Sequence, residues 1–147
     1  MAATAWSFYN SFKDKLGNAL FDLNATTYDY SMALFTNSAS TNANNVALST
    51  YASIANEVAN GNGYATGGVS VSGRTWTSVA TNKFRWDATA VVWTATGGDI
   101  ADIKYAIIYK SGGALVCFSK LSTSHFTLTQ DNTLTITPNA NGIFELS

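Results

Sequence analysis

The only histidine of the chain, His125, is the first residue to consider for chemistry, because a catalytic triad or a histidine-containing metal site would depend on it. It lies in a polar stretch directly before Phe126, and we interpret it as a loop residue. Asp99 and Asp102 are close in sequence, but they flank a predicted turn as solvated or capping groups would. Paired acids for glycoside hydrolysis need a cleft and a defined separation, and the sequence indicates neither. We therefore expect no enzyme, no cofactor and no metal site.

A lone cysteine and a glycine-rich stretch are the other candidates for chemistry. Cys117 lies within an apolar run, which favours a small buried hydrophobic residue over a reactive thiol. Gly61, Gly63, Gly67 and Gly68 fall within eight positions, but their spacing is neither that of a Walker loop nor that of a dinucleotide fingerprint. We expect these glycines to take positive φ values, or to allow close backbone approach, in a wide turn.

The composition limits the class of protein. The chain has 147 residues, with 8 basic and 9 acidic side chains and a net charge of -1. This balance lacks the electrostatic footprint of a protein that binds nucleic acid or an anionic membrane surface. No apolar run is long enough for a membrane span, and the N-terminus lacks the pattern of a signal peptide. We expect one domain over residues 1–147, made in the cytoplasm, that binds neither nucleic acid nor membrane.

The elements that must position these residues are mainly strands. The segment 102–121 predicts a β-hairpin, because residues 103–110 alternate with the period of a strand, residues 111–113 allow a reversal, and residues 115–118 return. Further strands are predicted at 28–35 (half-buried), 69–76, 83–88, 90–96, 126–129, 134–137 and 143–146. The pattern favours an all-β fold: an antiparallel β-sandwich, jelly-roll-like in topology.

Two short helices are predicted in the N-terminal half. The first covers residues 6–16, with Ser7 as its N-cap and an aromatic stripe that includes Phe8 and Phe12. We expect residues 1–26 to form a helical arm that packs on the sandwich or on a neighbouring subunit. The second helix follows Ser49, and the polar stretch 36–45 before it predicts an exposed loop.

Aromatic side chains provide the candidates for a binding surface. Four tryptophans contribute to an aromatic content of 13%, and such rings either pack in a sandwich core or stack on sugars and partner proteins. Trp86 shares one face of its predicted strand with Phe84, so we expect it to anchor an interface if it is exposed to solvent. The candidate interface residues are Trp6, Phe8, Phe12, Phe84 and Trp86.

The order of several motifs resembles a family of small virion proteins of tailed bacteriophages, over residues 8 to 147. The motifs are Gly61-Asn62-Gly63-Tyr64 with Gly67-Gly68, Trp93-Thr94 before Gly98-Asp99-Ile100, Tyr105-Ala106-Ile107-Ile108-Tyr109, and Gly142-Ile143-Phe144. Two stretches depart from the family pattern, where more acidic residues are usual: Arg85-Trp86-Asp87 and Ser119-Lys120-Leu121.

The resemblance implies a structural role on the capsid surface of a virion. Head-decoration or minor capsid proteins of this kind cement neighbouring capsid subunits, often as oligomers. The expected partners are therefore the major capsid protein and further copies of the chain itself. Attachment to a tail, vertex or fibre, with recognition of a host-surface glycan or another virion protein, is the alternative that the resemblance leaves open.

Overall fold

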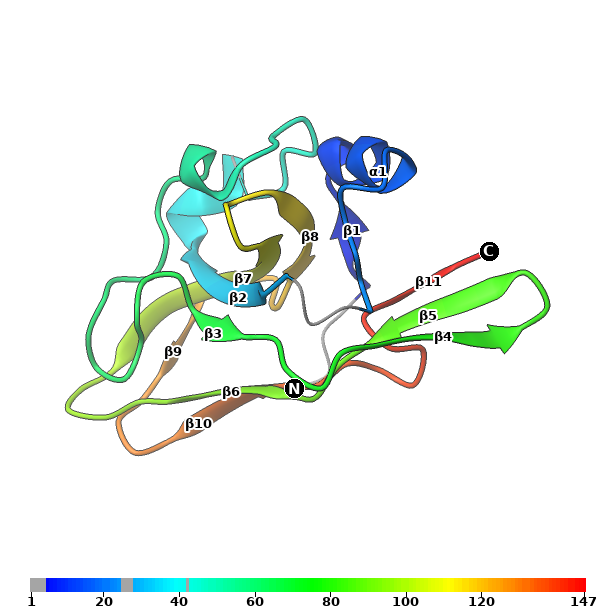
Figure 1. Cartoon of the computed structure of the whole chain (residues 1–147). Helices are drawn as coiled ribbons and strands as arrows, with labels where there is room; N and C mark the ends of the chain where they lie inside the picture. Colours follow the sequence, from blue (N-terminus) through cyan, green and yellow to red (C-terminus); the bar gives the residue numbers. More distant parts are fainter. Residues whose placement is uncertain (1–4, 25–27, 42) are drawn as a thin grey trace.

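A computed structural model describes residues 5–24, 28–41 and 43–147, and it places the strands in three antiparallel sheets with one α-helix near the N-terminus (Figure 1). The expected all-β, antiparallel sandwich is confirmed. The elements are β1 Ser7–Phe8, α1 Asn10–Gly17, β2 Tyr30–Thr36, the 3-10 helices η1 Asn37–Thr41 and η2 Tyr51–Ser53, β3 Val69–Ser70, β4 Thr75–Ala80, β5 Lys83–Asp87, β6 Val91–Thr94, β7 Ile100–Lys110, β8 Leu115–Lys120, β9 Phe126–Leu128, β10 Thr133–Ile136 and β11 Phe144–Leu146.

The largest sheet has the order β1-β8-β7-β2-β3, and β9 also pairs with β7. Its centre is the predicted hairpin, because β7 and β8 pair antiparallel in a register that brings Ile107 opposite Phe118. Gly112 and Gly113 in the connecting turn have φ values of 87° and 89°, which glycine adopts at little steric cost. The prediction of a hairpin over 102–121 is confirmed, and β7 extends to Ile100.

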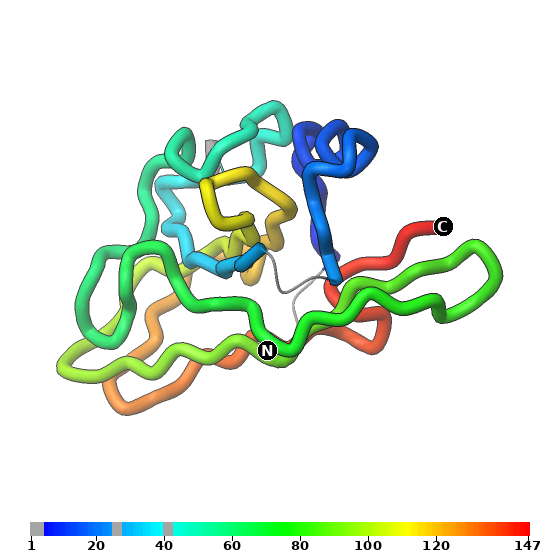
Figure 2. Tube along the Cα trace, in the orientation of Figure 1, coloured from blue at the N-terminus to red at the C-terminus, as the bar shows by residue number. Residues whose placement is uncertain are grey.

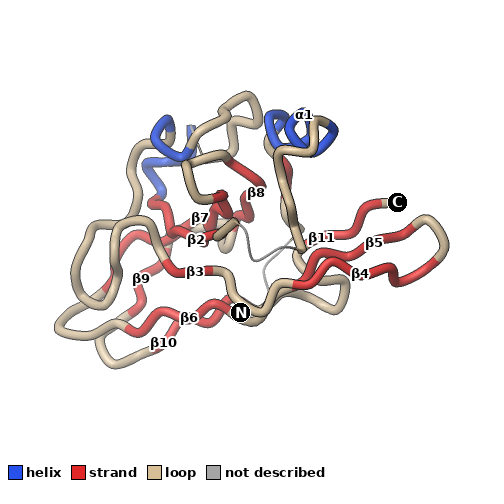
Figure 3. The backbone as a smooth tube through the Cα atoms, viewed as in Figure 1, coloured by secondary structure: helices blue, strands red, loops and turns tan. Residues whose placement is uncertain are grey.

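Two smaller sheets complete the sandwich. They are the pair β10-β6 and the three-stranded sheet β11-β5-β4. In the view of Figure 3, the pair β10-β6 lies below the main sheet and the three-stranded sheet lies to its right. One continuous core joins all three sheets, because Ile108 of the main sheet belongs to the same buried cluster as Trp93 of β6 and Trp86 of β5. The sandwich therefore has one large sheet on one side and two small sheets on the other.

The strand β2 is buried on both faces, so the prediction of a half-buried strand is wrong. Met32 and Leu34 belong to the core between the sheets, whereas Phe35 belongs to a second buried cluster on the opposite face. The segment after β2 covers that face, because Ala39 and Ala43 are both 0% exposed. The expectation of an exposed loop over 36–45 is therefore right for Ser38, Asn44 and Asn45, which are exposed, but wrong for Ala39 and Ala43, whose small side chains pack closely against the sheet; residue 42 lies outside the described residues.

The predicted strand 69–76 is divided between two sheets. Its first part, β3, pairs with β2, and its last part begins β4 in the three-stranded sheet. Gly73, with a φ of 61°, lies at the division. The guanidinium of Arg74 stabilises this crossing between the sheets by donating hydrogen bonds to the carbonyls of Val71 (2.8 Å) and Tyr28 (2.9 Å). The path from one sheet to the other can be followed in the green part of the trace in Figure 2.

The N-terminal helix begins later than predicted. Ser7 is not its N-cap, because Ser7 and Phe8 form β1, which pairs with β8. Tyr9 continues this pairing with a backbone hydrogen bond to Val116, so α1 starts only at Asn10. Its side chain Phe12 is buried and contacts the ring of Phe8, with 5.4 Å between centroids. The helix thus packs on its own chain. The helix expected after Ser49 is only the single turn η2.

Candidate functional site

The three-stranded sheet β11-β5-β4 projects from the body of the molecule (Figure 1). One of its faces is apolar, because three aromatic side chains lie next to one another across the strands. Trp86 of β5 is paired with Trp76 of β4 and with Phe144 of β11, so all three share this face. Near the body this face is covered by the N-terminal segment, and Phe8 contacts Phe144 with 4.8 Å between ring centroids. Towards the tip it is uncovered, since Phe84 is 42% exposed.

Trp86 is not exposed to solvent, so it is not an interface anchor. It is 0% exposed, and its indole N–H donates a hydrogen bond to the carbonyl of Leu23 at 3.0 Å. Its ring also contacts Tyr30 and Phe144, each with 5.3 Å between centroids. Trp86 is therefore a core residue that joins the projecting sheet to the main sheet.

The other predicted interface residues differ in how accessible they are to a partner. Phe12 is 1% exposed and packs against Phe21, so it is not accessible to a partner. Trp6 and Phe8 are half-buried against the core, and Phe84 is the one with a large exposed area. Contact of Trp6, Phe8 and Phe84 with another protein stays a prediction.

We define the apolar ledge as Trp76, Phe84 and Leu146, three neighbouring side chains on the uncovered part of the apolar face. The rings of Trp76 and Phe84 are stacked, with 5.7 Å between centroids and 11° between planes. Leu146 is the cross-strand neighbour of Phe84. Sequence reasoning missed Trp76 and Leu146, because the pairing that brings them beside Phe84 joins three separate segments.

Glu145 stabilises the ledge from the opposite face of the sheet. Its carboxylate forms ion pairs with Lys83 at 2.7 Å and with Arg85 at 2.8 Å, and Arg85 Nε donates a second hydrogen bond at 3.0 Å. Hydrogen bonds from Lys83 and from Arg85 lower the pKa of Glu145. These contacts bind the C-terminal strand β11 to β5, so the three strands present the ledge as one unit.

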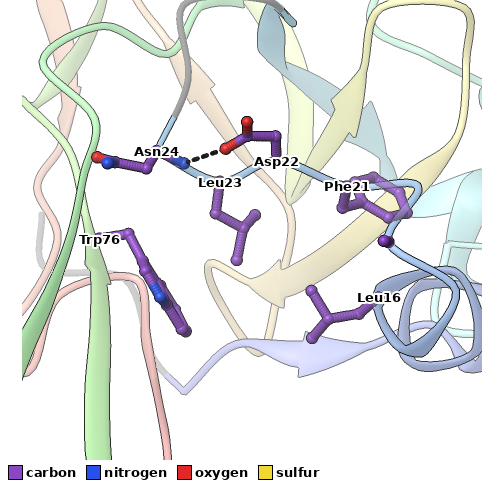
Figure 4. A pocket seen from close by; sticks show the side chains of 7 residues that line it. Leu16, Phe21, Asp22, Leu23, Asn24 and Trp76 are labelled. Carbon is purple, nitrogen blue, oxygen red and sulfur yellow. Dashed lines mark hydrogen bonds between the residues drawn. The ribbon is translucent and has the colours of Figure 1, made fainter.

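A pocket of ≈ 350 Å³ lies beside the ledge, between the segment after α1 and the projecting sheet. In Figure 4, Leu16 and Trp76 are on opposite sides of this pocket, with Leu23 between them. Polar groups lie at one side, where Asp22 accepts a hydrogen bond from the backbone N–H of Asn24 at 3.1 Å. An aromatic ring with nearby amide and carboxylate groups has the chemistry to bind an apolar side chain or a sugar.

A second pocket, of ≈ 420 Å³, is more polar and lies near the candidates for chemistry. Asp99 lines it and accepts a hydrogen bond from the backbone N–H of Gln130 at 2.8 Å. Asp102 also lines it, and His125 Nδ1 is 3.7 Å from its carboxylate, with the side chains of His125 and Asp102 57% and 40% exposed. A contact between side chains this accessible to water contributes little to stability. Within the described parts of the chain, no three His, Cys, Asp or Glu side chains form a group that could hold a metal ion.

The glycine-rich turn and the cysteine agree with the sequence-based interpretation. Gly61, Gly63, Gly67 and Gly68 all have positive φ values, and Gly68 lies so close to β2 that a Cβ atom would be 1.9 Å from the carbonyl oxygen of Met32. Burial raises the pKa of the Cys117 thiol well above its usual value, which disfavours the reactive thiolate.

The fold is that of an all-β, antiparallel sandwich with a projecting three-stranded sheet. Comparisons with protein-family models, with curated proteins and with solved structures found no match. Over the part of the chain that the structure describes, no helix is long and apolar enough to cross a membrane.

Proposed function

We propose that this chain is a virion structural protein that decorates and cements the capsid lattice of a tailed bacteriophage by non-covalent binding to the major capsid protein. The resemblance of its motifs to small phage virion proteins suggests this class. The structural observation that supports it is the apolar ledge on the projecting sheet, where Phe84 is exposed beside the half-buried side chains of Trp76 and Leu146. Exposed apolar patches beside a pocket are a common feature of protein-binding surfaces.

The proposed mechanism is additive binding. A protein that binds only the assembled, expanded lattice stabilises that state by mass action, in proportion to its affinity and concentration. Each copy bridges neighbouring capsid subunits, so many weak junctions become jointly strong. In this proposal the chain is made in the host cytoplasm and resides on the capsid surface.

The decisive experiment is to count copies on purified virions and to rebind the purified chain to heads that lack it. We expect a copy number comparable to that of the capsid lattice. Substitution of the ledge residue Phe84→Ala should weaken rebinding at least about tenfold, since central apolar anchors dominate interface energies. The matched control is Val92→Ala, which removes an equally exposed apolar side chain from a different sheet. Equal rebinding of both variants would contradict the role of the ledge.

Salt provides an independent test of the kind of contact. Because the net charge is only -1 and the ledge is apolar, attachment should depend little on charge. Raising salt to about 1 M, where the Debye length is roughly 3 Å, should leave the protein on the particles. Release by salt alone would contradict attachment through the apolar ledge.

A second candidate function is a tail-, vertex- or fibre-associated module that binds a host-surface glycan or another virion protein. The pocket beside the ledge favours it, because Trp76 with Asp22 and Asn24 combines an aromatic ring with polar groups. Copy number separates the two candidates: a module at a tail or vertex is present in few copies. A glycan array with Trp76→Ala as the control would then test for sugar binding.

A further inference from the structure

The outer edge of the projecting sheet is an exposed strand, β4, whose backbone is paired on one side only in the part of the chain that the structure describes. β4 is the last strand of the order β11-β5-β4, and no strand among the described residues lies along its other side. Five of its six residues are exposed, and Trp76 alone is half-buried. Such an edge presents a row of backbone N–H and C=O groups that can pair with another strand.

Among the described residues, β4 is the longest uncharged edge strand. The two strands of the pair β10-β6 are also uncharged edges, but each has four residues, two of them buried. The opposite edge of the same sheet is β11, which has three residues and carries Glu145. The edges of the main sheet, β1 and β3, have two residues each. Proteins commonly protect an edge strand with a charged side chain or proline, but the six residues of β4 include neither. The register shift between Ser78 and Ala80 leaves Thr75–Ser78 as its regular part.

The charged side chains around β4 belong to the residue before it and to β5, where Asp87, opposite Thr75, accepts a hydrogen bond from the backbone N–H of Ala88. Arg74, which precedes the strand, donates both of its described hydrogen bonds to carbonyls of the body, those of Val71 and Tyr28. Lys83 and Arg85 belong to the neighbouring strand and are paired with Glu145. A partner strand therefore meets an edge whose own side chains are all uncharged, and it needs no charge of its own to be complementary to them.

We infer that β4 pairs antiparallel with β4 of a second copy of this chain, across a two-fold axis near Thr77. A two-fold axis brings the same strand against itself, so an uncharged edge meets an uncharged edge without repulsion. The result is a continuous six-stranded sheet. Threonine, tryptophan and valine in β4 are residues that favour such pairing. Since the strands β4 and β5 project from the body (Figure 1), the backbone of a second chain can approach the edge of β4 from outside.

The dimer would place two apolar ledges on one continuous sheet. Trp76 and Phe84 share a face, and antiparallel pairing in register preserves faces across the new strand pair. This deepens the proposed function, because two linked ledges bind a lattice more tightly than one. The pairing itself does not depend on that function.

The test is sedimentation equilibrium of the purified full-length chain from about 1 µM to about 200 µM, with amide hydrogen exchange at both concentrations. We expect a monomer–dimer equilibrium and slower exchange in residues 75–80 as the dimer forms. A monomer at all concentrations overturns the inference. So does a dimer without concentration-dependent protection of β4, because its interface then lies elsewhere.

Charge substitutions at the axis sharpen the test. Thr77→Lys places like charges across the two-fold axis and should raise the dimer dissociation constant at least about tenfold, whereas Thr133→Lys, on an exposed threonine of β10, controls for a lysine added to the surface. Because Arg85 is the cross-strand neighbour of Thr77 within one subunit, a second control is needed for instability of the fold itself. A mixture of T77K with T77E should dimerise again, and a merely unstable fold would not be rescued in this way. A dimer of unchanged affinity in T77K, or no rescue in the mixture, overturns the inference.

The outcomes also separate this inference from the proposed function. A monomer that still binds heads overturns the dimer alone, and a dimer that does not bind heads overturns the capsid proposal alone. Protection of β4 that appears only when heads are added would assign the edge to a capsid protein and overturn pairing between copies.

Discussion

The hydroxyl of Tyr64 donates a hydrogen bond to the carboxylate of Glu57 at 2.6 Å, while it accepts one from the backbone N–H of Leu34 at 3.0 Å. The same carboxylate accepts hydrogen bonds from the backbone N–H of Gly67 at 2.7 Å and from the hydroxyl of Tyr51. One side chain therefore joins both ends of the glycine-rich turn and, through Tyr64, attaches them to β2. Positive φ values let the turn bend, and this network selects one conformation.

The network predicts energetic coupling between Glu57 and Tyr64. Tyr64→Phe leaves the buried N–H of Leu34 without its hydroxyl partner, so we expect it to cost about 1–3 kcal/mol of unfolding free energy. Glu57→Gln should cost a similar amount. In a double-mutant cycle measured by urea denaturation, the coupling energy should be about 0.5–3 kcal/mol. Strict additivity of the two substitutions would contradict the network.

The close approach of the turn to β2 predicts an effect of Gly68→Ala. An added Cβ would lie 1.9 Å from the carbonyl oxygen of Met32, so the backbone must shift, and we expect a loss of at least about 3 kcal/mol. Gly112→Ala is the matched control: its φ is also positive, at 87°, but nothing lies within 4 Å of the added atom. That variant should lose about 1–2 kcal/mol. Similar losses in thermal denaturation of both would show that contact with β2 is unimportant.

Burial predicts opposite roles for two aromatic residues of β5. Trp86→Ala removes a fully buried side chain and its hydrogen bond to Leu23, and it should cost about 3–5 kcal/mol. Phe84→Ala loses mainly its stacking with Trp76 and should cost about 1 kcal/mol. Urea denaturation measures both values. A larger loss for Phe84 than for Trp86 would contradict this assignment.

The ion pairs of Glu145 predict a contribution to stability that depends on pH. Because the folded state lowers the pKa of this carboxyl below its usual 4.5, its contribution is fully present above pH 4.5 and is lost as the pH falls through the lowered value. Glu145→Gln should therefore lower the urea midpoint at pH 7, and its effect should shrink progressively as the pH falls below 4.5. If the difference between the two proteins grows as the pH falls, the sign is wrong.

Buried tyrosines predict a loss of stability in alkali. Burial raises the pKa of Tyr30 to about 12, with Arg74 opposing the shift, and burial followed by the hydrogen bond to Glu57 raises that of Tyr64 further. A raised folded pKa stabilises the fold below the usual value of 10.0, and this stabilisation is lost as the pH rises through the folded pKa. Ultraviolet titration should show a group of tyrosines that ionise only as the protein unfolds. Ionisation of every tyrosine near pH 10 with the fold intact would contradict this.

Local patterns in the sequence predict the features that depend on neighbouring residues. Alternation along 103–110 followed by Gly112 and Gly113 indicates the central hairpin, because side-chain period and turn chemistry act within a few positions. The apolar run around Cys117 predicts its burial for the same reason.

Only the tertiary structure decided which aromatic residues are accessible. Phe84 and Trp86 are two positions apart on one face of a strand, so alternation treats them alike, yet one is 42% exposed and the other 0%. The difference arises because Leu23, Tyr30 and Phe144, from distant parts of the chain, surround Trp86. Burial depends on where the strand leaves the body of the molecule, and contacts between segments far apart in sequence determine that position.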